Sequence, residues 1–235
     1  MTDHLPTVAL EAVPAVTAEQ MREVDRIMIE DVHLGLLQMM ENAGRSLARL
    51  VQARFGPRRV LVLAGPGGNG GGGMTAARHL ANAGVEVAVV LAGQRELSPA
   101  AAHQLDVLDR MGVEIRPVPV PADLVLDALI GYSLHGDPGG ATADLIEWTA
   151  GQPAPVLALD TPSGLDATTG APGTPCVSAT ATLTLAAPKT GLLRAPETGD
   201  LYLADISVPA AVYRAFDLTM PVDVFAAGPL VRLVS

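Results

Sequence analysis

Two aspartates stand at the ends of short apolar runs, where a carboxylate can take part in chemistry. Asp127 follows the run 124–126, and Asp160 follows the run 156–159. A carboxylate beside apolar strand residues needs a cation, backbone N–H donors or a ligand as its partner. If the runs are parallel strands, both carboxylates lie at the sheet edge where ligands bind. The alternative for each is a loop cap, since residues 161–164 (Thr-Pro-Ser-Gly) favour a turn.

A run of glycines at residues 65–73 can bring a ligand close to the backbone. It reads Gly-Pro-Gly-Gly-Asn-Gly-Gly-Gly-Gly and follows the apolar segment 60–64. Glycines leave backbone N–H groups open to an anion, and a helix after them adds its dipole. The spacing G-x-G-x-x-G is that of a dinucleotide-binding turn, although no acidic residue ends the next apolar run, 85–91. The pattern predicts a phosphate-binding turn, and a glycine loop without a ligand is the alternative.

A third group of polar residues follows the strand that carries Asp127. Residues 131–137 could close over a ligand at the sheet edge, and an ordinary surface loop is the alternative. Lys189 follows another strand at the same edge, where it is either functional or solvated. The loop residues are Gly131, Tyr132, Ser133, Leu134, His135, Gly136 and Asp137.

Alternating strands and helices must position these residues. After residue 60, short apolar runs alternate with helix patterns, which indicates a mostly parallel sheet with helices on both faces. The predicted strands are residues 60–64, 85–91, 113–120, 124–129, 156–159, 181–185 and 201–206, and the predicted helices are residues 74–82, 98–111 and 141–150.

Two further helices are predicted before the first of these strands. Thr17 begins a capping box with Gln20, and the second helix runs over residues 36–55 until a Gly-Pro pair ends it. We expect residues 1–16, which are polar or interrupted by proline, to be poorly ordered. Because no repeat and no domain-sized linker occurs, residues 1–235 are predicted to form a single domain.

The composition excludes several classes of protein. A net charge of -10 leaves no basic stripe for nucleic acid. No apolar run is long enough to cross a membrane, and no signal-peptide pattern occurs. The one cysteine, Cys176, cannot form an internal disulfide, which favours a cytoplasmic protein. The histidines lack transition-metal spacing, and neither a nucleophile elbow nor a P-loop sequence is present.

Taken together, the sequence blocks resemble the YjeF N-terminal domain family of NAD(P)H-hydrate epimerases, which includes apolipoprotein A-I binding protein. The resemblance extends from about Thr17 to Val212. Several blocks in the same order are more specific than any one of them. The blocks are residues 39–44 (Met-Met-Glu-Asn-Ala-Gly), 65–73, 76–80 (Ala-Ala-Arg-His-Leu), 127–131 (Asp-Ala-Leu-Ile-Gly), 160–166 (Asp-Thr-Pro-Ser-Gly-Leu-Asp) and 184–189 (Thr-Leu-Ala-Ala-Pro-Lys).

The resemblance implies an α/β fold: a Rossmann-like three-layer sandwich with a mostly parallel central sheet and N-terminal helices. It implies a homodimer that interconverts the R and S hydrates of NADH and NADPH, a step of nucleotide repair. A separate hydrate dehydratase is a possible partner, and residues 1–235 are not expected to include an ATP-dependent dehydratase domain. Neither nucleic acid nor a membrane is expected as a partner.

The resemblance also implies roles for individual residues. It implies a potassium ion near Asn69, Asp127 and Ser163, whose oxygens suit a hard cation. Asp160 is expected to act as acid/base at the ring hydroxyl, and Lys189 as a second proton-handling group. The residues implied to contact the hydrate are Gly68, Asn69, Gly70, Gly71, Gly72, Gly131, Tyr132, Ser133, Leu134, His135, Gly136, Asp137 and Asp160.

The glycine run departs from the family pattern at two positions. The family turn usually reads G-P-G-N-N-G-G-D-G, whereas this sequence has Gly68 in place of the first Asn and Gly72 in place of the Asp. Two polar side chains are therefore absent from the ligand wall. This favours an alternative in which a diverged relative binds a nucleotide or another small ligand, as a scaffold or as an enzyme on another substrate. An ordinary nicotinamide dehydrogenase is disfavoured by the missing acidic residue after the second strand.

Overall fold

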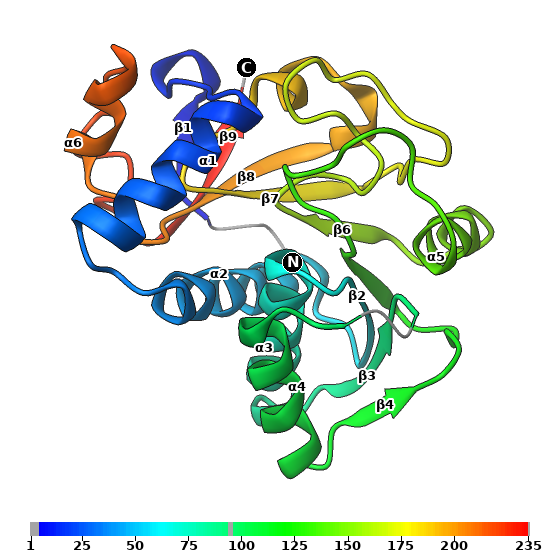
Figure 1. Cartoon of the computed structure of the whole chain (residues 1–235). Helices are drawn as coiled ribbons and strands as arrows, with labels where there is room; N and C mark the ends of the chain where they lie inside the picture. The colour runs from blue at the N-terminus through cyan, green and yellow to red at the C-terminus, as the bar shows by residue number, and fades with distance from the viewer. Residues whose placement is uncertain (1–4, 94–95, 235) are drawn as a thin grey trace.

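The computed structural model describes residues 5–93 and 96–234, and all strands within them belong to one twisted sheet (Figure 1). The strand order is β1-β9-β8-β7-β6-β5-β2-β3-β4, and every neighbouring pair is parallel except β8 and β9. The strands are β1 (Thr7–Ala9), β2 (Arg59–Ala64), β3 (Glu86–Leu91), β4 (Glu114–Arg116), β5 (Leu124–Ala128), β6 (Val156–Leu159), β7 (Ala181–Leu185), β8 (Asp200–Ala204) and β9 (Leu230–Val234).

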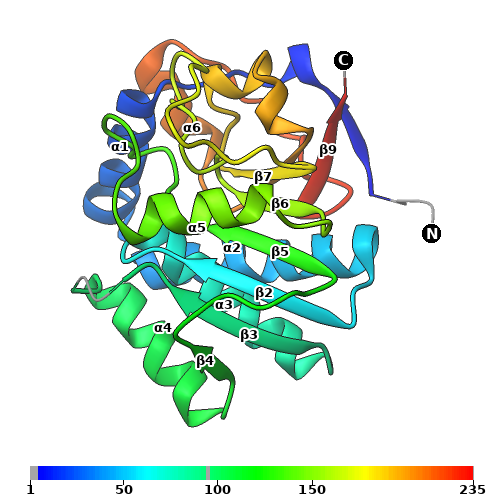
Figure 2. The same cartoon turned by 90° about the vertical axis from the view of Figure 1, so that its right-hand side faces the viewer.

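Helices cover both faces of this sheet, which confirms the predicted three-layer α/β architecture. Figure 2 shows α5 in front of the sheet and α2 and α3 behind it. The helices are α1 (Ala18–Arg26), α2 (Leu36–Leu50), α3 (Gly68–Asn82), α4 (Pro99–Arg110), α5 (Ala141–Ala150) and α6 (Ala210–Tyr213). In the described part of the chain, no helix combines the length and the apolar character needed to cross a lipid bilayer.

Alternate residues of the buried strands face opposite layers, and aliphatic side chains fill both. In β2, Val60 and Val62 pack with the layer of α2, α3 and α4, whereas Leu61 and Leu63 pack with the layer of α5. All four side chains are at most 2% exposed. The continuous apolar run of β2 therefore reflects burial on both faces, as is usual for a parallel strand.

The first described residues differ from the expectation of a poorly ordered segment 1–16. Thr7–Ala9 forms β1, which pairs in parallel with β9 at the sheet edge, and Val13 and Val16 are buried. Backbone hydrogen bonds to a strand more than two hundred residues away order this segment, so local composition could not reveal it. Residues 1–4 lie outside the described residues. The capping box of Thr17 and Gln20 is confirmed at the start of α1.

The glycine run also differs from the expected turn, because α3 begins within it at Gly68. Gly70 and Gly73 lie in the first turns of this helix, where it touches the sheet. A Cβ on Gly73 would lie 2.4 Å from the Cβ of Ala128, and one on Gly70 would lie 1.8 Å from the carbonyl oxygen of Gly65. These glycines let the helix approach β5 and the preceding turn closely, which favours glycine despite its low helix propensity.

Candidate active site

The strand order brings the three predicted regions together at the carboxyl ends of β2, β5 and β6. Asp127 lies in β5, beside Leu63 of β2 and Ala158 of β6. Asp160 follows the last residue of β6, and the glycine run follows β2. These neighbouring strand ends form the edge at which open α/β sheets bind ligands.

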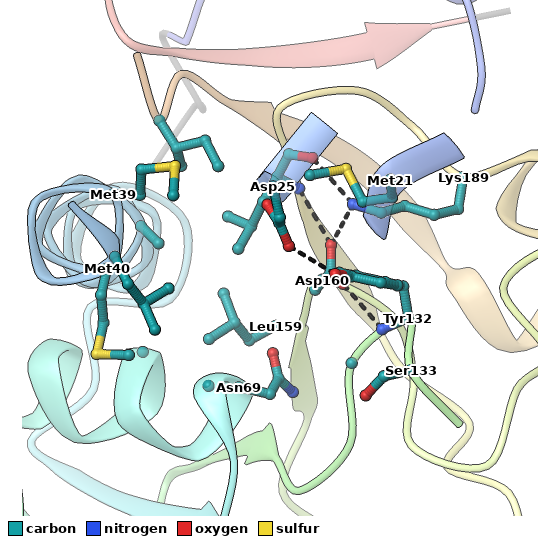
Figure 3. A pocket seen from close by; sticks show the side chains of 17 residues that line it. Met21, Asp25, Met39, Met40, Asn69, Tyr132, Ser133, Leu159, Asp160 and Lys189 are labelled. Carbon is teal, nitrogen blue, oxygen red and sulfur yellow. Dashed lines mark hydrogen bonds and ion pairs between the residues drawn. The ribbon is translucent and has the colours of Figure 1, made fainter. Parts of the chain in front are cut away.

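A cavity of about 200 Å³ opens at this edge (Figure 3). One part of its wall is apolar and includes Met39, Met40 and Leu159. Gly68 and Gly72 of α3 also line it and contribute no side-chain polar group. The polar side chains that line the cavity are those of Asp25, Asn69, Tyr132, Ser133, Asp160 and Lys189. A small apolar cavity with a few converging polar groups is typical of a ligand-binding site.

The Asp160 carboxylate is held by three donors. Its Oδ1 accepts from the Lys189 ammonium, with which it forms a buried ion pair, and more weakly from the backbone N–H of Leu185 at 3.4 Å. Its Oδ2 accepts from the backbone N–H of Tyr132 at 3.0 Å. Asp160 is 4% exposed and Lys189 is 0% exposed. The carboxylate is therefore fixed in orientation, and its charge is balanced beside the cavity.

The Lys189 ammonium has no remaining hydrogen to donate. Besides Asp160, it contacts the Thr184 hydroxyl at 3.3 Å and the Leu185 carbonyl oxygen at 2.9 Å. An ammonium has three donors, and these three acceptors use them all. The geometry therefore favours a positioning role for Lys189 over the predicted role of a second proton carrier.

Tight turns aim these groups at the cavity. Asp160 has φ +68°, and the N–H of Thr161 donates to the Leu159 carbonyl at 2.9 Å across it. The same arrangement follows β7. Ala186 has φ +65°, and the N–H of Ala187 donates to the Leu185 carbonyl oxygen at 2.7 Å. A three-residue turn with positive φ is rare and strained in non-glycine residues. Two such turns on adjacent strands, one bearing Asp160 and one leading to Lys189, indicate a functional constraint.

Asp127 lies in a different environment, although its strand is next to that of Asp160. Its Oδ1 accepts from the Ser163 hydroxyl at 2.6 Å and from the Leu129 N–H at 3.2 Å, and its Oδ2 accepts from the Ser163 N–H at 2.8 Å. No cationic side chain of the described residues contacts it. Asp127 is 0% exposed, and this burial raises the pKa of its carboxyl from 3.8 to about 6, against the hydrogen bonds, which lower it.

Asn69 lines the cavity from the first turn of α3. Its Nδ2 is buried and has no hydrogen-bond partner among the described residues. A Cβ on Gly131 would lie 3.2 Å from Asn69 Oδ1 and 3.0 Å from Asp160 Oδ2. A side chain at residue 131 would crowd these polar atoms, so the glycine helps them to converge.

Of the other residues that were predicted to contact the hydrate, some line the cavity and some do not. Gly131, Tyr132 and Ser133 line the cavity, as do Gly68 and Gly72. The others do not line it: Gly70 and Gly71 pack inside the fold, and Leu134, His135, Gly136 and Asp137 follow in the outer part of the loop. Among the described residues, no cluster of three His, Cys, Asp or Glu residues is arranged to hold a metal ion.

Asp25 is the cavity residue that the sequence analysis missed. It lies on α1, distant in sequence from the strand ends, and its Oδ2 accepts from the Tyr132 hydroxyl at 2.5 Å. Desolvation raises the pKa of Asp25, while the bond to Tyr132 and the charge of Lys189 lower it. One signal was present: Asp25 is four residues after Met21 and follows Val24, so an acidic residue adjoins the apolar face of the helix.

Comparison with known proteins places the chain in a family. The family described as YjeF-related protein N-terminus matches residues 36–191. The chain belongs to this family. It is similar over 94% of its length to the crystal structure of yeast ynu0 (YNL200c), of which it covers 100%, with a TM-score of 0.83 and 22% identity. That likeness confirms the Rossmann-like fold.

Relatives in other organisms carry more specific names. An NAD(P)H-hydrate epimerase of Dehalogenimonas lykanthroporepellens is 47% identical over 96% of this chain and 95% of its own length. One from Rhodopirellula baltica is 36% identical over 87% of this chain and 89% of its own length. A bifunctional NAD(P)H-hydrate repair enzyme Nnr of Salinibacter ruber is 38% identical over 85% of this chain, which covers 42% of that longer protein.

Proposed function

We propose that this protein is an NAD(P)H-hydrate epimerase, which interconverts the R and S hydrates of NADH and NADPH. The observation that carries the proposal is the fixed Asp160 carboxylate, ion-paired to Lys189 on the wall of a cavity beside the first turn of α3. Relatives named for this activity match the chain over nearly its whole length. A helix N-terminus favours an anionic group, so the phosphates of the nucleotide would lie toward α3.

The reaction inverts the carbon that carries the hydroxyl next to the ring nitrogen. The C–O bond breaks, the hydroxyl leaves as water with one added proton, and the nitrogen lone pair forms a C=N bond. Water then adds to the opposite face of the ring cation and gives up a proton. The Asp160 carboxylate would stabilise the cation by its charge and act as acid/base at the hydroxyl. Its three donors keep it aimed at the ring without reorganisation.

The apolar part of the cavity suits the reduced nicotinamide ring. Met39, Met40 and Leu159 offer a surface without polar groups, against which a flat ring can pack. By restricting access of bulk water, such a wall strengthens the attraction between Asp160 and the ring cation. Gly68 and Gly72 extend the same wall on the side of α3.

The residues predicted to hold potassium fit such an ion. Asp127 is a fully buried carboxylate with no cationic partner in the described part of the chain, and a buried charge needs one. Asn69, Asp127 and Ser163 carry the oxygen donors that a hard cation prefers. When bound, potassium would neutralise Asp127 and stabilise the loops that bear Ser163 and Asn69. We propose these three residues as its ligands.

The proposal is tested by following the equilibration of a purified R or S hydrate of NADPH by chromatography. The purified protein should speed the approach to the R/S equilibrium well above the spontaneous rate, and heat-unfolded protein should not. No acceleration with either NADH or NADPH hydrate would contradict the proposed function. The relative rates of the two hydrates would also establish which nucleotide is preferred.

A second candidate is a diverged family member that binds a nucleotide without turning it over. The observation that favours it is the pair Gly68 and Gly72, which leaves this part of the cavity wall without polar side chains. It predicts binding of NADPH in calorimetry with no epimerisation. A homodimer, a separate dehydratase partner and a cytoplasmic location complete the proposal, and sedimentation of the purified chain tests the first of them.

A further inference from the structure

Epimerisation needs two proton transfers at different places, and Asp160 is fixed at one of them. One proton goes to the hydroxyl that leaves, and another comes from the water that enters on the opposite face of the ring. Both carboxylate oxygens of Asp160 are held by donors that keep its orientation. A second proton-handling group must therefore line the cavity. This argument rests on the proposed function.

Among the described residues of the cavity, three other side chains are titratable: Asp25, Tyr132 and Lys189. The Lys189 ammonium is disfavoured as a direct donor to a ligand, because Asp160, Thr184 and Leu185 accept from its three N–H groups. Asp25 and Tyr132 remain, and they are joined by the 2.5 Å hydrogen bond from the phenol to the carboxyl (Figure 3).

We propose that Asp25, paired with the Tyr132 hydroxyl, is the second acid/base group of this site. In one direction the protonated Asp25 carboxyl gives its proton to the leaving hydroxyl, and Asp160 takes a proton from the entering water. In the other direction the two carboxyls exchange these roles. Between turnovers a proton passes from one carboxyl to the other through water, so no oxidant, reductant or further reactant is needed.

Asp25 and Asp160 have different charged and hydrogen-bonding neighbours, as their different acid and base roles require. Asp160 has a cation bonded to it, whereas Asp25 has only the Tyr132 phenol as hydrogen-bond partner in the described structure. The other charged or titratable groups that face this pair are Lys189, Asp160, Arg22 and Tyr213. Burial, chiefly, raises the pKa of both Asp25 and Tyr132, so both hold a proton more firmly than usual. Two carboxyls in contrasting environments are a recurrent basis for acid/base pairs.

The test compares Asp25→Asn, Asp25→Glu and Tyr132→Phe with the wild type in NADPH-hydrate epimerisation, measured in both directions. Asp25→Asn should lower kcat by about 10²-fold or more, because a positioned acid/base group contributes this much. Asparagine can still accept from Tyr132, so thermal unfolding and the Kd for NADPH should stay near the wild-type values. Glu19→Gln, an exposed acid-to-amide change on the same helix, is the matched control.

The pH profile separates proton transfer from a merely structural role. In the direction in which Asp25 is the acid, the wild-type rate should fall as pH rises past the pKa of Asp25, since the protonated form is required. Asp25→Asn should lose this limb, Asp25→Glu should keep a shifted one with partly restored kcat, and Tyr132→Phe should displace it. An active wild type with an equally active Asp25→Asn, or with an unchanged profile, would overturn this inference alone. An inactive wild type would overturn the proposed function and this inference together.

Discussion

Asp127 and Asp160 stand at the ends of neighbouring parallel strands, yet only Asp160 has a cationic side chain as a partner among the described residues. Asp160 is paired with the buried ammonium of Lys189 at the cavity wall. Asp127 is equally buried and, in the described part of the chain, its carboxylate accepts only from Ser163 and Leu129. This difference underlies our proposal that Asp160, which has its own cation, serves the cavity and that Asp127 binds an external cation.

The largest expected effect comes from breaking the Asp160–Lys189 pair. Asp160→Asn should lower epimerase activity by about 10³-fold or more, because it removes both a proton-transfer group and the charge that stabilises the ring cation. It should also destabilise the fold by about 3–5 kcal/mol, since it leaves the Lys189 ammonium buried without a counter-charge. Rate measurements and urea denaturation check the two parts.

Two companion variants sharpen this prediction. Adding Lys189→Met to Asp160→Asn should recover part of the lost stability, since no charge is then left unpaired, but none of the activity. Asp144→Asn makes the same change on the exposed face of α5 and should alter neither quantity. If Asp160→Asn kept its activity, Asp160 would not be the acid/base group. If the Asp160→Asn, Lys189→Met double variant were no more stable than Asp160→Asn, the unpaired Lys189 charge would not be the cause of the lost stability.

The next effect concerns the pH dependence of stability at Asp127. Burial raises the pKa of this carboxyl from 3.8 to about 6 in the folded protein, so between these pH values the folded state binds a proton that the unfolded chain has lost. The contribution of Asp127 to stability is therefore complete below about pH 4 and declines as pH rises through 6. The decline is about 3 kcal/mol, from 1.36 kcal/mol per pKa unit.

This contribution is measured as a difference between two proteins in potassium-free buffer. The free energy of unfolding of the wild type minus that of Asp127→Asn should decrease from pH 4 to pH 6, because asparagine does not titrate. Subtraction removes the other carboxyls, several of which have lowered pKa values and act in the opposite direction. A difference that stays constant or increases over this range would contradict the proposed environment of Asp127.

A smaller effect is expected from potassium itself. An ion that binds the folded state stabilises it by about 1–2 kcal/mol at roughly ten to thirty times its Kd. Potassium chloride should therefore raise the Tm of the wild type more than choline chloride at equal ionic strength. The rise should disappear in Asp127→Asn and persist in Asp160→Asn. A potassium response that Asp160→Asn abolished and Asp127→Asn kept would reverse the assignment of the two carboxylates.

The positions of both aspartates at one sheet edge could be predicted from the sequence, because an apolar run followed by a polar residue marks the end of a buried strand. Buried apolar runs followed by Asp127 and Asp160 predicted the parallel strands and the edge that both residues share. The contrast in their partners could not be predicted, since Lys189 meets Asp160 only through the turns after β6 and β7. Periodicity does not record which side chains a turn with positive φ brings together.

The strand β1 and the position of Asp25 could not be predicted either, because both depend on contacts between residues distant in sequence. β1 forms only because β9, at the other end of the chain, supplies its hydrogen-bond partners. Asp25 reaches the cavity because the apolar face of α1 packs in the same core cluster as residues of β8 and β9, and one acid beside an apolar face is a weak signal by itself. The glycines of 68–73 were interpreted as a turn, since glycine is rare in helices unless close packing requires it, as at Gly73.

The smallest expected effect returns a polar side chain to the cavity of Asp160. Gly68 lines this cavity, and no atom lies within 4 Å of a Cβ placed on it, so Gly68→Asn should fold with stability within about 0.5 kcal/mol of the wild type. The new amide should change the KM for the hydrate by a few fold, and the potassium response should persist, because the three proposed ligands Asn69, Asp127 and Ser163 are all retained. Gly139→Asn, at an exposed glycine with equal space, is the control and should change neither. A Gly68→Asn variant that altered the potassium response while sparing the KM would mean that Gly68 belongs with Asp127 rather than with Asp160.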